Sequence, residues 1–575
     1  MKPTPSTVEV TTVDIVVGQM IIERDVPIHM SDGVVLRGNL YRPVNPGRYP
    51  LIANMGPYSK DRPMSDVYPM RWARMVQQYP DVLQESSGKY LVWEVPDPER
   101  WIPRGYALLH IDSRGTGRSP GGWNPHSSRE TADFGEAIEW AAAQDWSNGR
   151  VGVMGVSYYA MAAWRVAAIS PPHLTAAIPW HGVLDLYRDW SCHGGIFSNG
   201  FSDLWWYRWL MNQHGYPDGA ISPYDGKRTT GPATLSESER AAQRIEYDQE
   251  VRRRPLIDDF WRERSADPTR ITVPVLSVGN WGTAGLHLRG NIEGFVRAAS
   301  KEKWLVMLAA KQARVERFHD QAGIALQQRF FDYYLKGLEN NWPAQPRVSV
   351  EIRMPEGRRR WRTDATWPLA TTRFTKFHID ANKRIMSEEA PTTPGIARYH
   401  SNSDGVTLRT TPFKHETEIT GPLKLRLHVS TEKPDMDIFV IVRATHPEGQ
   451  LVNYYRIYNM ASTRGWLRLS HRKLDSKAST DCRPIHPHDE LLPVEPGKLY
   501  EVDVEILPTS MVVPAGGRLL ITIQGVDAGD TEQTRHNDPK DRRFERFAGY
   551  YSFFSGPGHD SFLLLPIIDA KGGDR

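Results

Sequence analysis

A serine stands at a junction between two segments of different character. Residues 151–154 are apolar, Gly155 and Ser157 follow them, and residues 160–168 have the composition of a helix. This order predicts a buried strand, a sharp turn and a helix, with Ser157 at the apex of the turn. A serine in that place reaches into a cleft, and the amides of the next helical turn point at whatever bonds to it. We therefore interpret the segment as a nucleophile elbow.

The elbow departs from its usual pattern at one position. The glycine that normally follows the serine by two residues is replaced by Tyr159, with the small Ala160 after it. A Gly-x-Ser string is also common by chance. The strand before Ser157 and the helix after it supply the context that favours a nucleophile.

Composition narrows the classes of function. The 575 residues carry a net charge of +3, and the one short basic run, 357–360, is typical of a solvated turn, so we expect no nucleic-acid partner. The two cysteines, Cys192 and Cys482, lie far apart, which excludes a disulfide framework and favours a reducing compartment. We find no signal-peptide pattern and no run of membrane-spanning length, and expect a soluble, cytoplasmic protein. Disorder is expected only in the first few residues and in 571–575.

Strand and helix patterns alternate through the first 345 residues. A hairpin is predicted over 26–41, followed by buried strands at 50–55, 106–111, 151–154, 174–180, 271–278 and 304–308. Helices are predicted at 130–144, 160–168, 295–299 and 324–338. This alternation predicts a parallel sheet with helices on both faces.

Two other segments break the alternation. Residues 185–264 are aromatic, charged and helical in pattern, which indicates a cap inserted into the sheet domain. Beyond residue 346, short alternating runs between turn signals predict an antiparallel sandwich, a jelly roll. The predicted domains are a sheet domain in two parts, 1–184 and 271–345, a helical cap over 185–270, and a jelly roll over 346–575. A further insertion, 66–96, is expected to be partly helical and to lie over the cleft.

With these motifs assembled, the chain resembles the CocE/NonD (cocaine-esterase-like) hydrolases, which are relatives of the X-Pro dipeptidyl peptidases and the α-amino-acid ester hydrolases. The resemblance runs nearly end to end and implies an α/β-hydrolase domain, a helical cap and a C-terminal jelly roll. Besides the elbow it rests on Ser31-Asp-Gly33, Gly56-Pro-Tyr-Ser59, Asp112-Ser-Arg-Gly-Thr-Gly-Arg-Ser119, Ala132-Asp133, Trp146-Ser-Asn-Gly-Arg-Val-Gly152, and Arg329-Phe-Phe-Asp332 before Leu335-Lys-Gly337.

The resemblance implies roles for three residues. Ser157 would attack a carbonyl carbon and form an acyl-enzyme that water then hydrolyses. The Tyr158 amide and the phenol of Tyr58 would hold the developing oxyanion. Asp112 and Asp133 also match family positions, and we interpret both as structural.

The base and its orienting acid depart from the family pattern. Where the family has an aspartate after the strand ending at Val278, this chain has Gly282 or Thr283, and Gln312 or Arg314 occupies the family's histidine position. Three readings stay open. His319 could be the base, oriented by Glu316, Asp320 or a distant carboxylate; His287 could have moved in from the acid's loop; or the base could be lost.

Several functions are compatible with these residues. The preferred one is a serine hydrolase that cleaves an ester or amide of a small acyl compound, bound in an aromatic cleft suggested by the tryptophans between Trp180 and Trp209. A degenerate hydrolase that binds a small molecule, or promotes a cyclisation or elimination, is the second. An X-Pro aminopeptidase is the third, and it would need carboxylates from the cap, for which the candidates are Asp185, Asp189, Asp203 and Asp218.

No cofactor is expected, and a homodimer is possible because the family includes dimers. Cys482, His486 and His488 are residue types that bind metal ions, but no fourth ligand stands at a matching spacing. We therefore interpret them as part of a surface loop rather than as a metal site.

Overall fold

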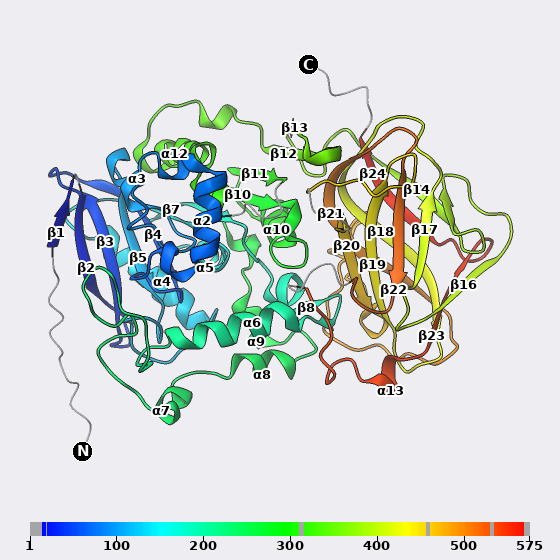
Figure 1. Cartoon of the computed structure of the whole chain (residues 1–575), viewed down its shortest axis with the longest axis horizontal. Helices are drawn as coiled ribbons and strands as arrows, with labels where there is room; N and C mark the ends of the chain where they lie inside the picture. Colours follow the sequence, from blue (N-terminus) through cyan, green and yellow to red (C-terminus); the bar gives the residue numbers. More distant parts are fainter. Residues whose placement is uncertain (1–13, 19, 310–314, 456–459, 529–533, 569–575) are drawn as a thin grey trace.

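The buried strands of the first half of the chain pair into one sheet, seen at the left of Figure 1. The computed structural model describes residues 14–18, 20–309, 315–455, 460–528 and 534–568. The two tails expected to be disordered lie outside these ranges, as do Gln312 and Arg314. In spatial order the strands are β1 (Asp14–Val17), β2 (Met20–His29), β3 (Val35–Pro43), β5 (Ala107–Asp112), β4 (Tyr49–Gly56), β6 (Ser147–Val156), β7 (Leu174–Trp180), β10 (Val275–Asn280), β11 (Lys303–Leu308), β12 (Val348–Arg353) and β13 (Arg359–Asp364).

The strands from β5 to β12 run parallel, as the alternating pattern predicts. The register places Ala53 opposite Leu109 on one side and Val153 on the other. Parallel strands leave their carboxyl ends at one edge of the sheet, where ligands of open α/β sheets bind. The β10 strand begins at Val275 rather than at 271. The hairpin of β2 and β3 pairs antiparallel, as expected.

Helices cover both faces of this sheet. On one face α4 (Ser128–Ala142) and α5 (Tyr158–Ile169) share a buried cluster with the apolar residues Leu51 and Val153. On the other face α12 (Gln321–Lys336) contributes Phe330 and Phe331 to the buried cluster that contains Ile52. The apolar residues of α4 recur at positions i, i+3, i+4 and i+7, which gives the helix one buried stripe: Phe134, Ala137, Ile138 and Ala141.

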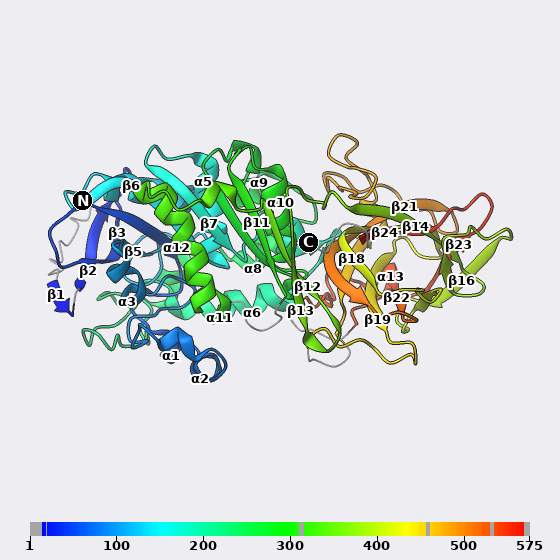
Figure 2. The same cartoon turned by 90° about the horizontal axis from the view of Figure 1, so that it is seen from above.

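Short helices fill the two insertions. The first contains α1 (Met64–Val67) and α2 (Pro69–Gln78), which project from the body of the molecule in Figure 2. The second connects β7 to β10 and contains α6 (Asn199–Trp209), α7 (Glu237–Ala242), α8 (Tyr247–Arg252) and α9 (Asp259–Arg264). The helix after β10, α10 (Leu288–Arg297), begins seven residues before the predicted start at 295. Within the described ranges no helix is both long and apolar enough to span a bilayer.

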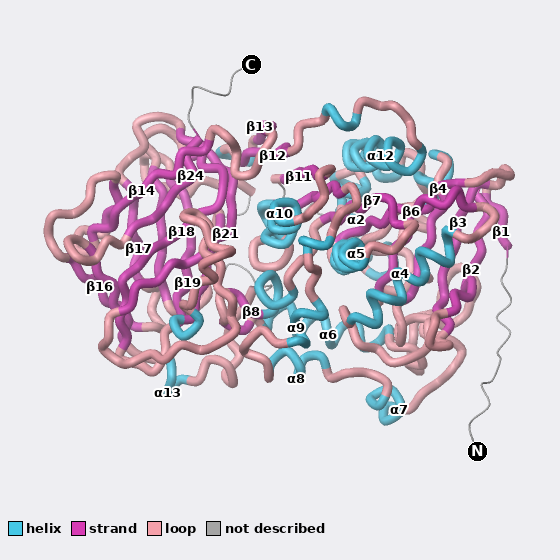
Figure 3. The backbone as a smooth tube through the Cα atoms, turned by 180° about the vertical axis from the view of Figure 1, so that it is seen from behind, coloured by secondary structure: helices cyan, strands magenta, loops and turns pink. Residues whose placement is uncertain are grey.

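In the C-terminal part of the chain the regular elements are mostly strands joined by long loops, as the tube in Figure 3 shows. Its central strand β18 (Thr417–Thr431) pairs antiparallel with β21 (Tyr500–Val513), β23 (Tyr550–Ser555) and β24 (Phe562–Ile568). A second group joins β17 (Val406–Thr410), β22 (Arg518–Gln524), β19 (Asp437–Thr445) and β20 (Thr463–Arg468), also antiparallel. Side chains from both groups form one buried apolar cluster. We call residues 372–568 of this part the β domain.

The structure confirms the expected structural roles of two aspartates and contradicts the expected exposure of two histidines. Asp112 accepts hydrogen bonds from the backbone amides of Lys60 and Arg118, and Asp133 pairs with Arg114, so both are structural as expected. The surface-loop interpretation of His486 and His488 is wrong, because both residues are buried. The His488 ring packs on Tyr187, and the His486 carbonyl accepts a hydrogen bond from Arg188.

A buried ionic network joins β2 to the loop after β4. Lys60 Nζ lies 2.6 Å from Asp25 Oδ1 and 2.5 Å from Asp61 Oδ2, and Arg118 Nη1 lies 2.6 Å from Asp25 Oδ2. Burial alone would raise the pKa of Asp61, but the charges of Lys60 and Arg118 lower it to about 2. The network therefore compensates charges that would be costly if unpaired.

Replacing Lys60 by Met should destabilise the protein strongly. Removing one partner of a buried pair costs about 3–5 kcal/mol, which for a cooperative unit of several hundred residues corresponds to a fall in Tm of roughly 3–7 °C. Differential scanning calorimetry at one fixed scan rate measures the change. Lys498→Met is the matched control, because the Lys498–Glu495 pair is exposed and its loss should leave Tm unchanged. Equal Tm values for the two variants would contradict the account.

Candidate active site

Ser157 occupies the sharp turn between β6 and α5. Its backbone has φ 60° and ψ −112°, outside the regions that non-glycine residues usually adopt, and its side chain is 5% exposed. Such strain persists only where the surroundings fix it, and it is concentrated at functional sites. As the first residue of α5, Tyr158 has an amide without a carbonyl partner inside the helix. The predicted elbow is therefore present in the structure.

Two glycines make room for the unusual Tyr159. A methyl group on Gly56 would lie 2.6 Å from the Tyr159 ring, and one on Gly155 would lie 2.3 Å from Tyr159 Cβ. The tyrosine side chain thus fills space that the small residues at 56 and 155 leave open. Tyr159 also meets the edge of Tyr58, with ring centroids 5.7 Å apart.

The Ser157 hydroxyl is paired with a histidine. Ser157 Oγ lies 3.1 Å from His287 Nε2, within the range of a hydrogen bond between a nucleophile and its base. Both side chains are buried, and His287 is 1% exposed. Among the three readings of the base, the observed contact is the one expected if His287 comes from the acid's loop.

A series of tight turns brings His287 to this position. Asn280, at the end of β10, accepts a hydrogen bond from the Gly282 amide, and its carbonyl accepts one from the Thr283 hydroxyl. The amides of Leu286 and His287 then both donate to the Thr283 carbonyl at 3.1 Å. Gly282 and Thr283, the two candidates for the position where the resemblance predicts an aspartate, therefore shape the turns that lead into α10.

His319 lies in a different environment. It ends the short helix α11 (Glu316–His319), and its carbonyl accepts a hydrogen bond from the buried Arg100. Burial, followed by the charge of Arg100, lowers the pKa of His319 to about 3, so its imidazole is neutral and weakly basic. Within the described residues His319 Nε2 makes no hydrogen bond. The sequence favours His319, whereas the described contacts bring His287 to Ser157.

The two carboxylates considered as orienting acids next to His319 have other partners. Asp320 caps α12 by accepting a hydrogen bond from the Gly323 amide at 2.6 Å, and it pairs with Arg317. Glu316 is buried, with an oxygen 3.8 Å from Arg74. Asp320 and Glu316 thus each have a partner other than the His319 imidazole.

Tyr58 lies after the end of β4, beside the elbow. Its hydroxyl oxygen accepts a hydrogen bond from Trp205 Nε1 at 2.9 Å, and its ring packs on Trp209 with centroids 4.3 Å apart. Since the oxygen already accepts from Trp205, the phenolic proton can be donated elsewhere. Burial, aided by the charge of Glu94, raises the pKa of Tyr58 well above its usual value, so the phenol stays protonated.

His181 and Glu94 escaped the sequence analysis, which included Trp205 only as one of the tryptophans between Trp180 and Trp209. Trp205 is the hydrogen-bond partner of Tyr58, and His181 stacks on His287 with centroids 6.4 Å apart. The carbonyl of Glu94 accepts a hydrogen bond from Val156, the residue before the serine. Glu94 and His181 both have positive φ values, yet neither belongs to a motif that the sequence displays. No local pattern marks them, because the insertion and the sheet meet only in the folded chain.

The carboxylates proposed for an X-Pro aminopeptidase site are mostly paired with arginines. Asp185 is paired with Arg188, Asp189 with Arg289 and Asp203 with Arg252. Asp218 is exposed to solvent. None of the three paired carboxylates is available, without rearrangement, to hold the amino terminus of a peptide.

Metal-binding side chains do not gather in the part of the chain that the structure describes. The two ring nitrogens of His486 lie 2.9 Å from the carbonyl oxygens of Lys473 and Asp503, one of which accepts the single N–H of the neutral ring. His488 Nδ1 lies 3.0 Å from His471 Nδ1. Cys192 and Cys482 are unpaired. The contacts of His486 and His488 are thus with other protein groups, and these two histidines and Cys482 form no metal-binding group among the described residues.

The chain is similar to known proteins along most of its length. Residues 32–311 match the model of the X-Pro dipeptidyl-peptidase (S15) family, and residues 340–564 match that of the X-Pro dipeptidyl-peptidase C-terminal non-catalytic domain. The cocaine esterase of Rhodococcus sp. (strain MB1 Bresler) is 23% identical over 624 residues, which cover 96% of this chain and 99% of that protein.

Solved structures share the fold of this chain, and one of them shows its family. The α-amino-acid ester hydrolase, at 16% identity and a TM-score of 0.68, shares the fold over 98% of this chain and all of that one. A CocE/NonD family hydrolase from Staphylococcus aureus is 31% identical, with a TM-score of 0.84 over 96% of this chain and 94% of that chain. The chain therefore belongs to the CocE/NonD family of hydrolases.

Proposed function

We propose that this hydrolase is a serine esterase that cleaves an ester of a small acyl compound through a Ser157 acyl-enzyme. The observation that carries the proposal is the 3.1 Å contact between Ser157 Oγ and His287 Nε2 at the apex of the elbow. A serine hydroxyl is a weak nucleophile until an adjacent base takes its proton. His287 would supply that base from a position where relatives of the family place the acid.

In the proposed mechanism His287 accepts the Ser157 proton while Oγ bonds to the ester carbonyl carbon. The carbonyl oxygen becomes an oxyanion, which the Tyr158 amide and the Tyr58 phenol stabilise. His287 then donates the proton to the departing alcohol as the carbon–oxygen bond breaks, leaving an acyl-enzyme. A water molecule, deprotonated by His287, attacks the acyl carbon, and Ser157 leaves with the proton returned to it.

The surroundings of Tyr58 support its role as a donor. Trp205 fixes the phenol oxygen from one side, and burial keeps the phenol protonated. A preorganised donor of this kind is worth about 3 kcal/mol of transition-state stabilisation. The same aromatic side chains, Tyr58, Trp205 and Trp209, favour an apolar or aromatic acyl group as the substrate.

We also propose a division of the chain into an α/β-hydrolase domain, a cap and a jelly roll. Residues 185–270 would form the cap, because α6 places Trp205 beside the Tyr58 hydroxyl. Residues 346–575 would form a jelly roll attached to an α/β-hydrolase domain of residues 1–184 and 271–345. A cytoplasmic location is compatible with the two free thiols.

The alternative functions have less support. A degenerate hydrolase without a base is disfavoured by the histidine beside Ser157. An X-Pro aminopeptidase is disfavoured because Asp185, Asp189 and Asp203 are paired with arginines. The cocaine esterase relative, whose name specifies an ester, favours ester over peptide hydrolysis here.

Ser157→Ala and His287→Ala should each lower kcat/KM for p-nitrophenyl esters by roughly 10⁴-fold or more, because nucleophile and base act as a unit. His319→Gln should leave kcat/KM nearly unchanged, since the described contacts of His319 include neither Ser157 nor His287. Steady-state kinetics on folded variants measures the three effects. Loss of activity in His319→Gln together with full activity in His287→Ala would reverse the assignment of the base, and full activity in Ser157→Ala would refute the esterase proposal.

Tyr58→Phe should lower kcat by about 10²–10³-fold with little change in KM, because the phenol acts on the oxyanion rather than on the bound ester. Tyr454→Phe is the matched control: its hydroxyl donates to the Val512 carbonyl inside the β domain. Kinetics with one p-nitrophenyl ester compares the two. A KM effect without a kcat effect in Tyr58→Phe would show that the phenol contributes to substrate binding only.

A further inference from the structure

Helix α10 connects the catalytic pair to the β domain. His287 stands immediately before its first turn, and Arg289 lies two residues later within that turn. Any shift of this turn moves the His287 imidazole relative to Ser157. The contacts that hold the turn in place therefore bear on the geometry of the site.

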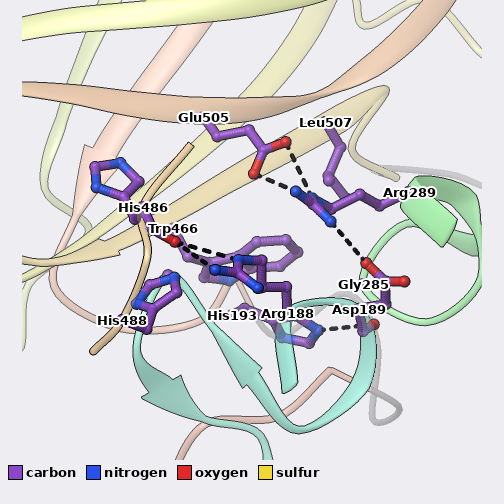
Figure 4. A pocket seen from close by; sticks show the side chains of 11 residues that line it. Arg188, Asp189, His193, Gly285, Arg289, Trp466, His486, His488, Glu505 and Leu507 are labelled. Carbon is purple, nitrogen blue, oxygen red and sulfur yellow. Dashed lines mark hydrogen bonds and ion pairs between the residues drawn. The ribbon is translucent and has the colours of Figure 1, made fainter. Parts of the chain in front are cut away.

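Arg289 joins three parts of the chain, as Figure 4 shows. Its Nη1 donates to Asp189 Oδ1 at 3.1 Å, and its Nε lies 3.1 and 3.2 Å from the two oxygens of Glu505. Asp189 belongs to the segment after β7, and Glu505 belongs to β21 of the β domain. Arg289 is 6% exposed, so these contacts are partly shielded from water.

Asp189 is itself fixed. Its Oδ2 accepts hydrogen bonds from the amides of Leu184 and Asp185, each at 3.0 Å. A methyl group added at Gly290 would lie 2.8 Å from that same oxygen, which shows how closely α10 approaches the segment. One side of the Arg289 guanidinium is therefore held by the α/β part of the chain.

The β domain holds the other side, and it also packs on the turn before His287. A methyl group added at Gly285 would lie 2.4 Å from Thr534 Cγ2 and 3.1 Å from the Trp466 ring. Gly285 and Arg289, on either side of His287, thus both meet residues of the β domain. A cavity of about 30 Å³ lies between them, with room for little more than a water molecule.

We propose that the β domain positions the catalytic base: Glu505 holds Arg289 and thereby fixes the turn of α10 that carries His287. This inference rests on the proposed function of Ser157 and His287. In the elbow itself no residue of the β domain is needed, because the strand and the helix supply the turn. The position of the base does depend on the β domain, because Gly285 before His287 and Arg289 after it both contact residues of that domain.

The ion pair between Arg289 and Glu505 explains why Glu505 should affect the position of His287. A buried arginine between two carboxylates is constrained at both ends, and removing one carboxylate leaves its charge undercompensated. The guanidinium would then move toward Asp189 or toward water, and the first turn of α10 would move with it. A misplacement of about 1 Å in a reacting group can cost roughly 10²-fold in rate.

Glu505→Gln should therefore lower kcat by about 10–100-fold, with little change in KM, and slow the labelling of Ser157 by a fluorophosphonate by a similar factor. Stopped-flow turnover of a p-nitrophenyl ester and intact-mass labelling rates measure the two effects. Glu501→Gln is the matched control on the same strand, because its side chain is 53% exposed against 22% for Glu505. Its kcat should equal that of the wild type.

A second variant separates positioning from simple loss of stability. Arg289→Lys keeps the charge but not the planar fork, so it should have a kcat between those of the wild type and Arg289→Met. Wild-type labelling rates in folded Glu505→Gln and Arg289→Met would overturn the inference. If Ser157→Ala retained esterase activity, the proposed function would fail instead, and the two failures are distinguishable because only the second concerns Ser157.

Discussion

The hydrogen bond between Ser157 and His287 is the contact on which the rest of the site depends. Its two ends come from turns 130 residues apart, one after β6 and one after β10. Adjacent parallel strands bring such turns to one edge of the sheet, and the pairing of β6 with β7 and of β7 with β10 does so here. A short contact between two buried side chains then requires that both turns be held rigidly, because small displacements break it.

Each turn is held by a different device. The serine turn is held within the first half of the chain: Gly56 at the end of β4 and Gly155 in β6 leave space for Tyr159, whose bulk would otherwise exclude a close strand-to-helix turn. The histidine turn is held by its own hydrogen bonds to Asn280 and Thr283 and by contacts outside the sheet. In the proposed mechanism the first turn supplies the nucleophile and one oxyanion donor, and the second supplies only the base.

Local patterns in the sequence predict the sheet and the elbow well, because strand and helix periodicities are local properties. They also point to Tyr58, through the family motif at 56–59. The base is harder to predict: His319 stands closer to the family's position in sequence, while His287 is brought to Ser157 by turns whose shape depends on Asn280 and Gly285. The tryptophan cluster that contains Trp205 indicates an aromatic cleft but not the hydrogen bond to Tyr58. Arg289 and Glu505 have no local signal at all, since each acts across segments that meet only on folding. The burial of His486 and His488 escaped prediction for the same reason.

A crystal structure of the enzyme after reaction with a fluorophosphonate would test the central claim most directly. The account predicts phosphorus bonded to Ser157 Oγ, with His287 Nε2 within hydrogen-bonding distance of the adduct. It also predicts the phosphoryl oxygen at about 3 Å from both the Tyr158 amide and the Tyr58 hydroxyl. An adduct in which His319 approaches the phosphonate and His287 turns away, or in which Ser157 remains unmodified, would contradict it.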